Sequence, residues 1–424
     1  MYKVFLPLLM SLLLASCASV QSIKPNEKAF EQEDTYVLFA LRAEQVNDHN
    51  SASILFNTLY EKSLKKEYLY RSLENDLVAK ENEKLIARVD QITKGSLADP
   101  QLIRFKVVAL LELQRFQEAQ ILAVALVHQT QESDDYLLVS ETYSKNKEYD
   151  IALKYLDSAY VKEYNEKILD QMSIILYVNL DRKKDAIAYL ETHMRVHGSS
   201  KLICNRLLGI YSNENNIDGL LSTYMRLYSI DQDSEVAKKI IGIYTYKRDY
   251  IHLTDFLEAS GSDDEVLLQL YSAAKNYKKA YPLADSLYKK TSDISYLGQS
   301  AIYEYESAKD KKSKKTLSSV IAKLTQVTNA SSEPLYMNYL GYILIDHEVD
   351  IKKGIAYIQA VLKLQPESAY YLDSLAWGYF KLGECEKAKK LISKVVKLEG
   401  GDDPEVLLHV KDIDKCIKTK KGKK

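Results

Sequence analysis

Glycine and proline are scarce in this sequence, with 14 glycines and 7 prolines among 424 residues. Ordinary proteins carry about 7% glycine and about 5% proline, so the chain has less than half the usual supply of residues for tight turns. A strand-rich fold, which needs many such turns, is therefore excluded.

The chain also lacks an excess of charge of one sign. Its 58 lysines and arginines nearly balance 59 aspartates and glutamates, which gives a net charge of −1. Nucleic acids are held largely by basic residues that neutralise phosphates, so we expect no nucleic-acid partner. A composition of 46% hydrophobic and 28% charged residues also lies far from that of disordered or integral membrane proteins.

Catalytic and metal-binding motifs are missing as well. There is no glycine-rich phosphate loop and no Gly-x-Ser-x-Gly elbow, and His347-Glu348 lacks the second histidine of a zincin helix. Only His193 and His197 have helical i, i+4 spacing, and no cysteine or acidic cluster accompanies them. We therefore expect no catalytic residue, no metal, no cofactor and no small-molecule substrate, and we interpret the chain as not an enzyme.

What the chain does have is material for a large helical core. Tyrosine is abundant, with 33 copies against 8 phenylalanines and one tryptophan. A tyrosine ring packs against apolar neighbours while its hydroxyl stays in contact with water. We expect an all-α fold with much half-buried helix surface.

The first residues are typical of a secretory signal. Lys3 precedes an apolar run from Val4 to Leu14, which is too short to span a bilayer. The run ends in Leu14-Ala15-Ser16-Cys17, which resembles the lipobox of bacterial lipoproteins. The alternative is an ordinary signal peptide with a chance cysteine.

The lipobox resemblance implies a processed and anchored chain. Residues 1–16 would be a lipoprotein signal peptide, Cys17 the lipidated first residue, and residues 17–34 a flexible tether containing Pro25. Ala18 stands where an aspartate would retain an enteric lipoprotein in the inner membrane, so outer-membrane anchoring facing the periplasm is expected. The location expected is thus the bacterial cell envelope.

A period of about 34 residues runs through the chain. Small or aliphatic residues recur at steps of 33 or 34, at Ala52, Leu85, Ala119, Ala152, Ala186, Leu220 and Leu253. A fixed period of this length is typical of stacked helix pairs. A packing residue often stands three positions earlier, as at Phe116 and Tyr149, and we expect it to begin a helix.

The pattern resembles the tetratricopeptide repeat and is clearest near the C-terminus. One unit has Leu340-Gly341, Gly354, Ile358, Val361, Leu364 and Pro366, and the next has Leu375-Ala376, Tyr379, Gly383, Ala388, Ile392 and Val395. The resemblance implies a right-handed α-solenoid of antiparallel helix pairs. We expect about eleven units from residue 35 to 400, followed by a capping helix over 403–417.

The units are not all regular. We divide the chain into a solenoid over 35–290, a divergent helix pair over 291–332, two well-matched units over 333–400, and a capping helix with a basic tail over 401–424. The second helix near residues 250–259 should be short and end at Gly261, and Pro282 predicts a late helix start or a kink. The turn after Ile345 carries one extra residue.

The resemblance also implies a binding groove lined by the first helix of each unit. In the last two units the groove positions, four residues apart on each helix, are Asn338, Tyr342, Asp346, Asp373, Trp377 and Lys381. An aromatic pair flanked by polar groups is typical of a recognition hot spot. The alternative is that Trp377 and Tyr342 only pack between units.

Three cysteines remain after Cys17. Cys385 begins a second helix and Cys416 ends the capping helix, and antiparallel neighbours bring such ends together, so we predict a Cys385–Cys416 disulfide. The alternative is two half-buried thiols. Cys204 is expected in the core, and the lysine-rich tail is expected to be solvated or to contact an anionic lipid or cell-wall polymer.

These observations favour a lipid-anchored periplasmic scaffold that binds partner proteins through its groove. The C-terminal units, with LGY, LDSLAWGYFKLG and DPEV, resemble the outer-membrane lipoprotein adaptor of a carboxyl-terminal processing protease. The alternative is a scaffold for pilus, polysaccharide-export or outer-membrane protein machinery. The sequence does not identify the partner protein.

Overall fold

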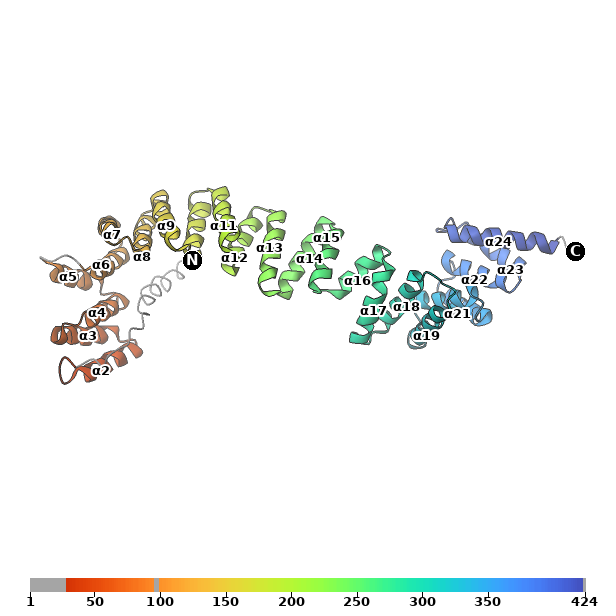
Figure 1. The fold of residues 1–424 in the computed structure, drawn as a ribbon, viewed down its shortest axis with the longest axis horizontal. Coiled ribbons are helices and arrows are strands. Elements are labelled where there is room, and N and C mark those ends of the chain that lie inside the picture. The colour runs from red at the N-terminus through yellow and green to blue at the C-terminus, as the bar shows by residue number, and fades with distance from the viewer. Residues whose placement is uncertain (1–27, 95–98, 422–424) are drawn as a thin grey trace. The chain divides into compact units, whose positions relative to one another are not determined.

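The computed structural model describes residues 28–94 and 99–421, and this part of the chain contains helices and no strands (Figure 1). The predicted signal peptide over 1–16, the predicted lipidation site Cys17 and Pro25 lie outside the described residues, as do Lys423 and Lys424. Helix contacts divide the chain into two compact units, with the boundary between Gln232 and Asp233. This boundary lies inside the predicted solenoid over 35–290.

The first unit contains six pairs of consecutive helices. They are α2 (Glu33–Gln45) with α3 (His49–Ser63), α4 (Lys66–Val78) with α5 (Asn82–Thr93), α6 (Pro100–Glu112) with α7 (Phe116–Thr130), α8 (Ser133–Lys145) with α9 (Tyr149–Glu163), α10 (Glu166–Ile174) and its π-helical continuation η2 (Ile175–Asn179) with α11 (Lys183–His197), and α12 (Lys201–Asn213) with α13 (Ile217–Asp231).

The second unit contains five pairs and one further helix. They are α14 (Ser234–Lys247) with α15 (Tyr250–Ser260), α16 (Asp264–Ala273) with α17 (Tyr277–Thr291), α18 (Ile294–Ser307) with α19 (Lys314–Ala330), α20 (Pro334–Asp346) with α21 (Ile351–Leu364), α22 (Ala369–Lys381) with α23 (Cys385–Val395), and α24 (Pro404–Lys421). The prediction of about eleven helix pairs and a capping helix is therefore confirmed over the described residues.

The 34-residue period marks one place in each pair. Every repeat residue from Ala52 to Leu253 is the fourth residue of a second helix, and where a packing residue such as Phe116 or Tyr149 stands three positions earlier, it begins that helix. Most of these residues are buried, and the small ones let the two helices of a pair approach closely. Leu220 is only half-buried. In its helix the closest approach is made by Gly219, where an added Cβ would lie 2.6 Å from the Tyr211 ring.

The turns inside the pairs explain how the chain manages with few glycines. Nine of the eleven pairs place one non-glycine residue at positive φ between their two helices, and a tenth pair places Gly383 there. The nine non-glycine residues are Asn47, Lys80, Gln114, Lys147, Asp181, Asn215, Arg248, Lys275 and Glu348. A left-handed conformation costs an L-residue about 1 kcal/mol, which the packing of the two helices must offset.

The irregular helices and turns agree with the sequence predictions in part. α15 ends at Ser260 with Gly261 in the left-handed conformation, as predicted for a short helix. The connection from α20 to α21 has four residues, one more than the connection from α22 to α23. The late helix start predicted from Pro282 is wrong, because α17 begins at Tyr277 and includes the proline. As the sixth residue of α17, Pro282 cannot donate the hydrogen bond that would otherwise reach the carbonyl of Lys278.

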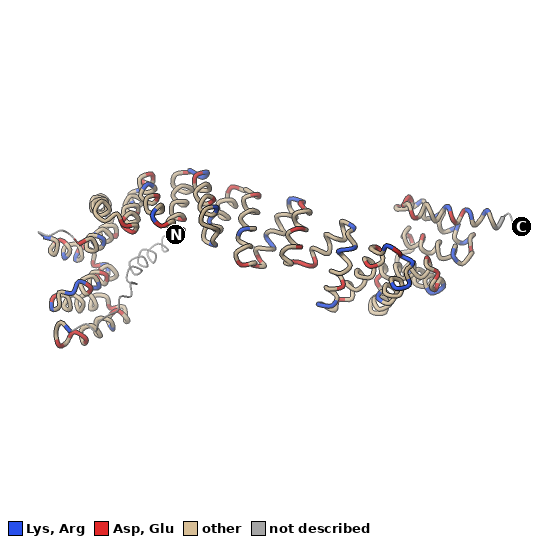
Figure 2. The backbone as a smooth tube through the Cα atoms, in the orientation of Figure 1, with Lys and Arg blue, Asp and Glu red and all other residues tan. Residues whose placement is uncertain are grey.

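Charged residues of both signs are interspersed along the helices of each unit (Figure 2). Several connect successive first helices: Arg71 on α4 donates to Glu44 on α2 at 2.8 Å, and Arg206 on α12 donates to Asp170 on α10 at 2.6 Å. Arg104 on α6 donates to the buried Asp135 on α8 at 2.7 Å. These bidentate arginine–carboxylate contacts fix the stacking of neighbouring pairs.

Candidate functional site

The six predicted groove residues lie on α20 and α22, two first helices that pack against each other. The structure brings three of them into contact. Trp377 Nε1 donates to Asp346 Oδ1 at 2.9 Å, and Lys381 Nζ donates to the Asp346 backbone oxygen at 3.1 Å. The Lys381 ammonium also lies 5.2 Å from the centre of the Trp377 ring.

α24 makes further contacts with these residues. The His409 ring stacks on the Trp377 ring with 4.0 Å between centroids. His409 Nδ1 lies 2.9 and 3.0 Å from the two carboxylate oxygens of Asp373. Tyr342 donates its hydroxyl to Glu405 in the first turn of α24.

The face of α20 and α22 is therefore covered where we expected an open groove. Trp377 is 7% exposed and Asn338 is fully buried. The physical reason is the apolar side of α24, whose Val406 and Ile413 must be buried and pack against Leu372 and Ile392. We name this covered surface, made of Asn338, Tyr342, Asp346, Asp373, Trp377 and Lys381, the α20–α22 face.

The rim of this face adds aromatic and basic groups that the sequence did not single out. Tyr305 on α18 shares a hydrogen bond of 2.9 Å with His347 Nε2, and the Lys311 ammonium lies 4.6 Å from the Tyr305 ring centre. Burial lowers the pKa of His347, and the nearby Lys312 and Lys381 lower it further, whereas Asp346 raises it. The lowered pKa favours the neutral form of His347, which adds no positive charge beside these lysines.

Hydroxyl groups on this face are kept protonated. Burial raises the pKa of Tyr342, and its hydrogen bond to Glu405 raises it further. Burial likewise raises the pKa of Tyr305. These hydroxyls are hydrogen-bond donors at every physiological pH, which suits binding and offers no general base.

Sequence reasoning missed Glu405 and His409, the two residues of α24 that contact the α20–α22 face. They stand four residues apart, the same spacing that selected the groove residues. That spacing places Glu405 and His409 on one side of the capping helix, next to Val406. It was the feature of the sequence from which their contact with this face could have been predicted.

The predicted cysteine pair lies at the other end of α24. Cys385 begins α23, Cys416 lies in the last turns of α24, and the two form a disulfide with a Cα–Cα distance of 6.0 Å. α24 is thus fixed at its first turn by Tyr342 and near its end by Cys385. Cys204, also as expected, is buried, and its thiol is free.

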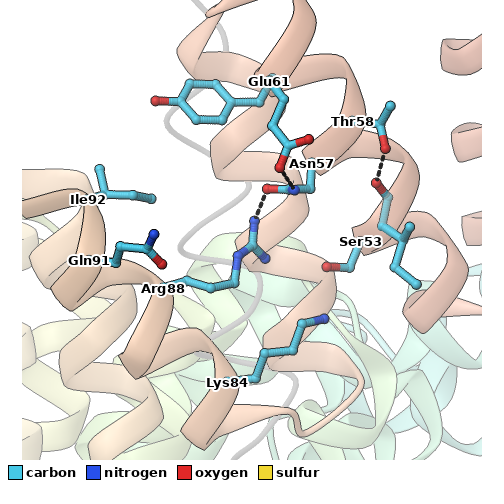
Figure 3. Close-up of a pocket in the computed structure, with 10 residues that line it drawn as sticks. Ser53, Asn57, Thr58, Glu61, Lys84, Arg88, Gln91 and Ile92 are labelled. Atoms are coloured by element: carbon cyan, nitrogen blue, oxygen red, sulfur yellow. Dashed lines mark hydrogen bonds between the residues drawn. The ribbon is translucent and has the colours of Figure 1, made fainter.

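A polar cavity of about 640 Å³ lies between α3 and α5 in the first unit (Figure 3). Arg88 reaches from α5 to donate to Asn57 at 2.6 Å, and Asn57 donates to Glu61 at 2.7 Å. Beneath them the fully buried Asp76 accepts bonds from Arg88, from Lys84 at 2.9 Å and from Ser53 at 2.6 Å. Because these groups already pair with one another, the arrangement joins the helices and offers no unpaired charge to a ligand.

The remaining candidates for chemistry are structural. His193 shares a hydrogen bond of 2.8 Å with the Tyr160 hydroxyl, and the His197 ring stacks on Tyr164 at 4.5 Å. Within residues 28–94 and 99–421, no group of three histidine, cysteine or acidic residues could hold a metal ion. In the same ranges, no helix has the length and hydropathy needed to cross a membrane.

Comparisons with known proteins return structural similarity alone. No protein-family model matches the sequence, and no curated protein matches it. The crystal structure of the APC/C hetero-tetramer Cut9–Hcn1 is similar over 91% of this chain and 97% of that chain, with 11% identity and a TM-score of 0.37. The structure of Naa15/Naa10 bound to HypK-THB is similar over 89% of this chain and 65% of that chain, with 11% identity and a TM-score of 0.29.

Proposed function

We propose that this chain is a lipid-anchored scaffold of the bacterial periplasm, held in the outer membrane at Cys17, that binds partner proteins through its stacked helix pairs. The α20–α22 face and its rim carry this proposal. At the rim, the half-buried Lys381 pairs with the exposed Glu348 in the turn after α20 and lies beside the ring of Trp377, whose other contacts include His409 of α24. Rigid aromatic side chains beside charged groups are the usual anchors of protein interfaces.

A binding role agrees with the chemistry of the described residues. Titratable clusters among them are paired between helices, as in Asp76 with Arg88, and several histidines, among them His197 and His347, stack on or hydrogen-bond to tyrosines. A scaffold needs this kind of rigid, satisfied framework and does not need a reactive group. The partner class favoured by the C-terminal sequence is a carboxyl-terminal processing protease, for which the chain would act as adaptor.

The anchor is tested by changing the proposed lipidation site. Cys17→Ser should move the protein from the membrane fraction to the soluble periplasmic fraction and abolish labelling with radioactive palmitate. Ala18→Ser is the matched control, because it leaves the cysteine in place, and should stay membrane-bound. Membrane association of the Cys17→Ser protein without palmitate labelling would contradict the anchor.

The binding surface is tested by photo-cross-linking in cells. A photoreactive amino acid at Glu348, beside the α20–α22 face, should give one defined protein adduct, and the same probe at the exposed Lys352 on α21 should not. Mass spectrometry of the adduct then separates the protease adaptor from the alternative, a scaffold for pilus, polysaccharide-export or outer-membrane protein machinery. Equal adducts at both positions, or none at Glu348, would contradict binding at this surface.

A further inference from the structure

The α20–α22 face binds a helix in this structure, and that helix belongs to the same chain. α24 packs on α22 and α23, and Glu405 extends the contact to α20 through the hydroxyl of Tyr342. The contact combines the stacked rings of His409 and Trp377 with the polar pair of His409 and Asp373. This is a recognition surface of aromatic, carboxylate and aliphatic groups arranged along one helix.

The connection to α24 differs from those between other helix pairs. Eight residues, 396–403, connect α23 to α24, compared with two between α3 and α4 and four between α21 and α22. Gly400 lies at a φ of +83° within this connection. A long connection with glycine allows α24 to leave its position without unwinding α23.

The contact of α24 combines the apolar core around Val406 and Ile413 with buried ionisable groups. It buries His409 and Asp373, and burying ionisable groups costs nearly as much as their pairing returns. One turn before Tyr342 on the same face, both amide atoms of Asn338 are buried and have no hydrogen-bond partner. The Asn338 amide is therefore an unsatisfied polar group on this side of α20.

We propose that the α20–α22 face is a binding site for an amphipathic helix, that α24 is its resident occupant, and that the Cys385–Cys416 disulfide locks α24 in place. The partner is a helix with the pattern of α24: a carboxylate four residues before an imidazole, with aliphatic residues next to each, as in Glu405, Val406, His409 and Val410. The partner rests on the proposed protein-binding function, whereas the lock is a property of this chain alone.

The lock opens by thiol–disulfide exchange. A dithiol reductant attacks one sulfur of the Cys385–Cys416 bond, the S–S bond breaks, and the reductant closes to its own disulfide. Two electrons and two protons pass to the chain, which then carries two thiols. α24 remains attached only through residues 396–403, so its effective concentration at the face falls and a competing helix gains access.

The single tryptophan reports the position of α24 directly. Trp377 is the only tryptophan in the sequence, and it is shielded by His409. In the anchor-free chain lacking residues 1–17, dithiothreitol should raise the quenching of Trp377 fluorescence by acrylamide several-fold. The double variant Cys385→Ser/Cys416→Ser should show the raised quenching without reductant and should not respond to it. Unchanged quenching on reduction would overturn the lock.

The site is tested with a peptide in trans. A fluorescently labelled peptide of residues 404–419 should bind the reduced protein and the double-serine variant. It should bind the oxidised protein at least tenfold more weakly. A peptide with Glu405→Ala and His409→Ala should bind neither form. Equal binding to both forms, or none to the reduced form, would overturn the helix-binding site.

Circular dichroism separates release of α24 from unfolding. Reduction should leave the helical signal of the second unit nearly unchanged, because α20 to α23 keep their mutual contacts. Loss of much of that signal on reduction would overturn the proposal and make the disulfide a staple of the fold. All of these measurements use purified protein, so they succeed or fail independently of the lipid anchor and of any cellular partner.

Discussion

Glu33 illustrates how single residues hold the first helix pair in place. It is 4% exposed on α2, and it accepts hydrogen bonds from Lys65 Nζ at 2.6 Å and from the Tyr68 hydroxyl at 2.7 Å. Burial alone would raise the pKa of Glu33, but these bonds and one from the Ala29 amide outweigh it and lower the pKa to about 2. The carboxylate is therefore favoured in the folded chain.

This lowered pKa predicts a pH dependence of stability in the first unit. Because the folded pKa lies below the ordinary value of 4.5, the stabilisation is present above pH 4.5 and is lost as the pH falls towards 2. We expect Glu33→Gln to lower the urea midpoint of the first unit at pH 6 and to reduce its decline between pH 4.5 and 2.5. Glu31→Gln, at a neighbouring exposed position, is the control and should retain the full decline. An equal decline in both variants would contradict the role of Glu33.

The residues at positive φ could not be predicted from the sequence. The scarcity of glycine correctly indicated a helical chain, because the many turns of a strand-rich fold would have required it. Lys80, Gln114 and Lys147 nevertheless adopt the left-handed conformation that the tetratricopeptide motif assigns to glycine. Nothing in the local sequence distinguishes them, because the packing of the two flanking helices imposes that conformation.

At the scale of helix pairs, close approach is concentrated at two glycines. α20 and α21 cross where Gly341 faces Gly354, and a Cβ added at Gly354 would lie 2.6 Å from the Gly341 backbone oxygen. The neighbouring atom is backbone and cannot rotate away. The helices would have to separate, and Ile345, which also contacts this point, would lose packing.

We therefore expect Gly354→Ala to destabilise the second unit by about 1–3 kcal/mol, as overpacking of a tight core does. Gly242→Ala is the matched control in the same unit. Gly242 is an exposed residue inside α14 with no atom within 4 Å of an added Cβ, so alanine should stabilise it by roughly 0.5–1 kcal/mol. Urea unfolding of both variants measures the difference, and the same sign of change in both would contradict this account of the crossing.

At the scale of elements, the existence of α24 was predicted from the sequence, but its contacts were not. Pro404 and the apolar pattern correctly predicted a helix after residue 403, and the spacing of Asn338, Tyr342 and Asp346 correctly placed them on one side of α20. The sequence did not show that His409 would stack on Trp377, because that depends on the angle at which α24 leaves the last pair. Such angles are set by the whole connection 396–403.

At the scale of the whole chain, repetition governs both length and stability. Each helix pair packs on its sequence neighbours, so the free energy of unfolding is close to a sum of local contributions. The 34-residue period predicted the helix pairs up to about residue 259, and the motif of the last two units predicted those near the C-terminus. The boundary between Gln232 and Asp233 was not predicted, because the period passes through it without interruption.

Two compact units of stacked pairs predict unfolding in more than one step. Far-UV circular dichroism reports helices of both units, whereas the fluorescence of Trp377 reports the second unit alone. We therefore expect the two urea transitions not to coincide. Asp76→Ala should separate them further, because it leaves Arg88 without its buried carboxylate and destabilises the first unit by about 3–5 kcal/mol.

The matched control for that variant is Asp90→Ala, which removes a half-exposed partner of Lys106 and should cost at most about 1 kcal/mol. In both variants the Trp377 transition should stay where it is in the parent protein, because neither residue lies in the second unit. A Trp377 midpoint that follows Asp76→Ala would show instead that all eleven pairs unfold as one cooperative body. The repeat would then transmit stability along its whole length, and the local additivity argued from neighbour contacts would fail.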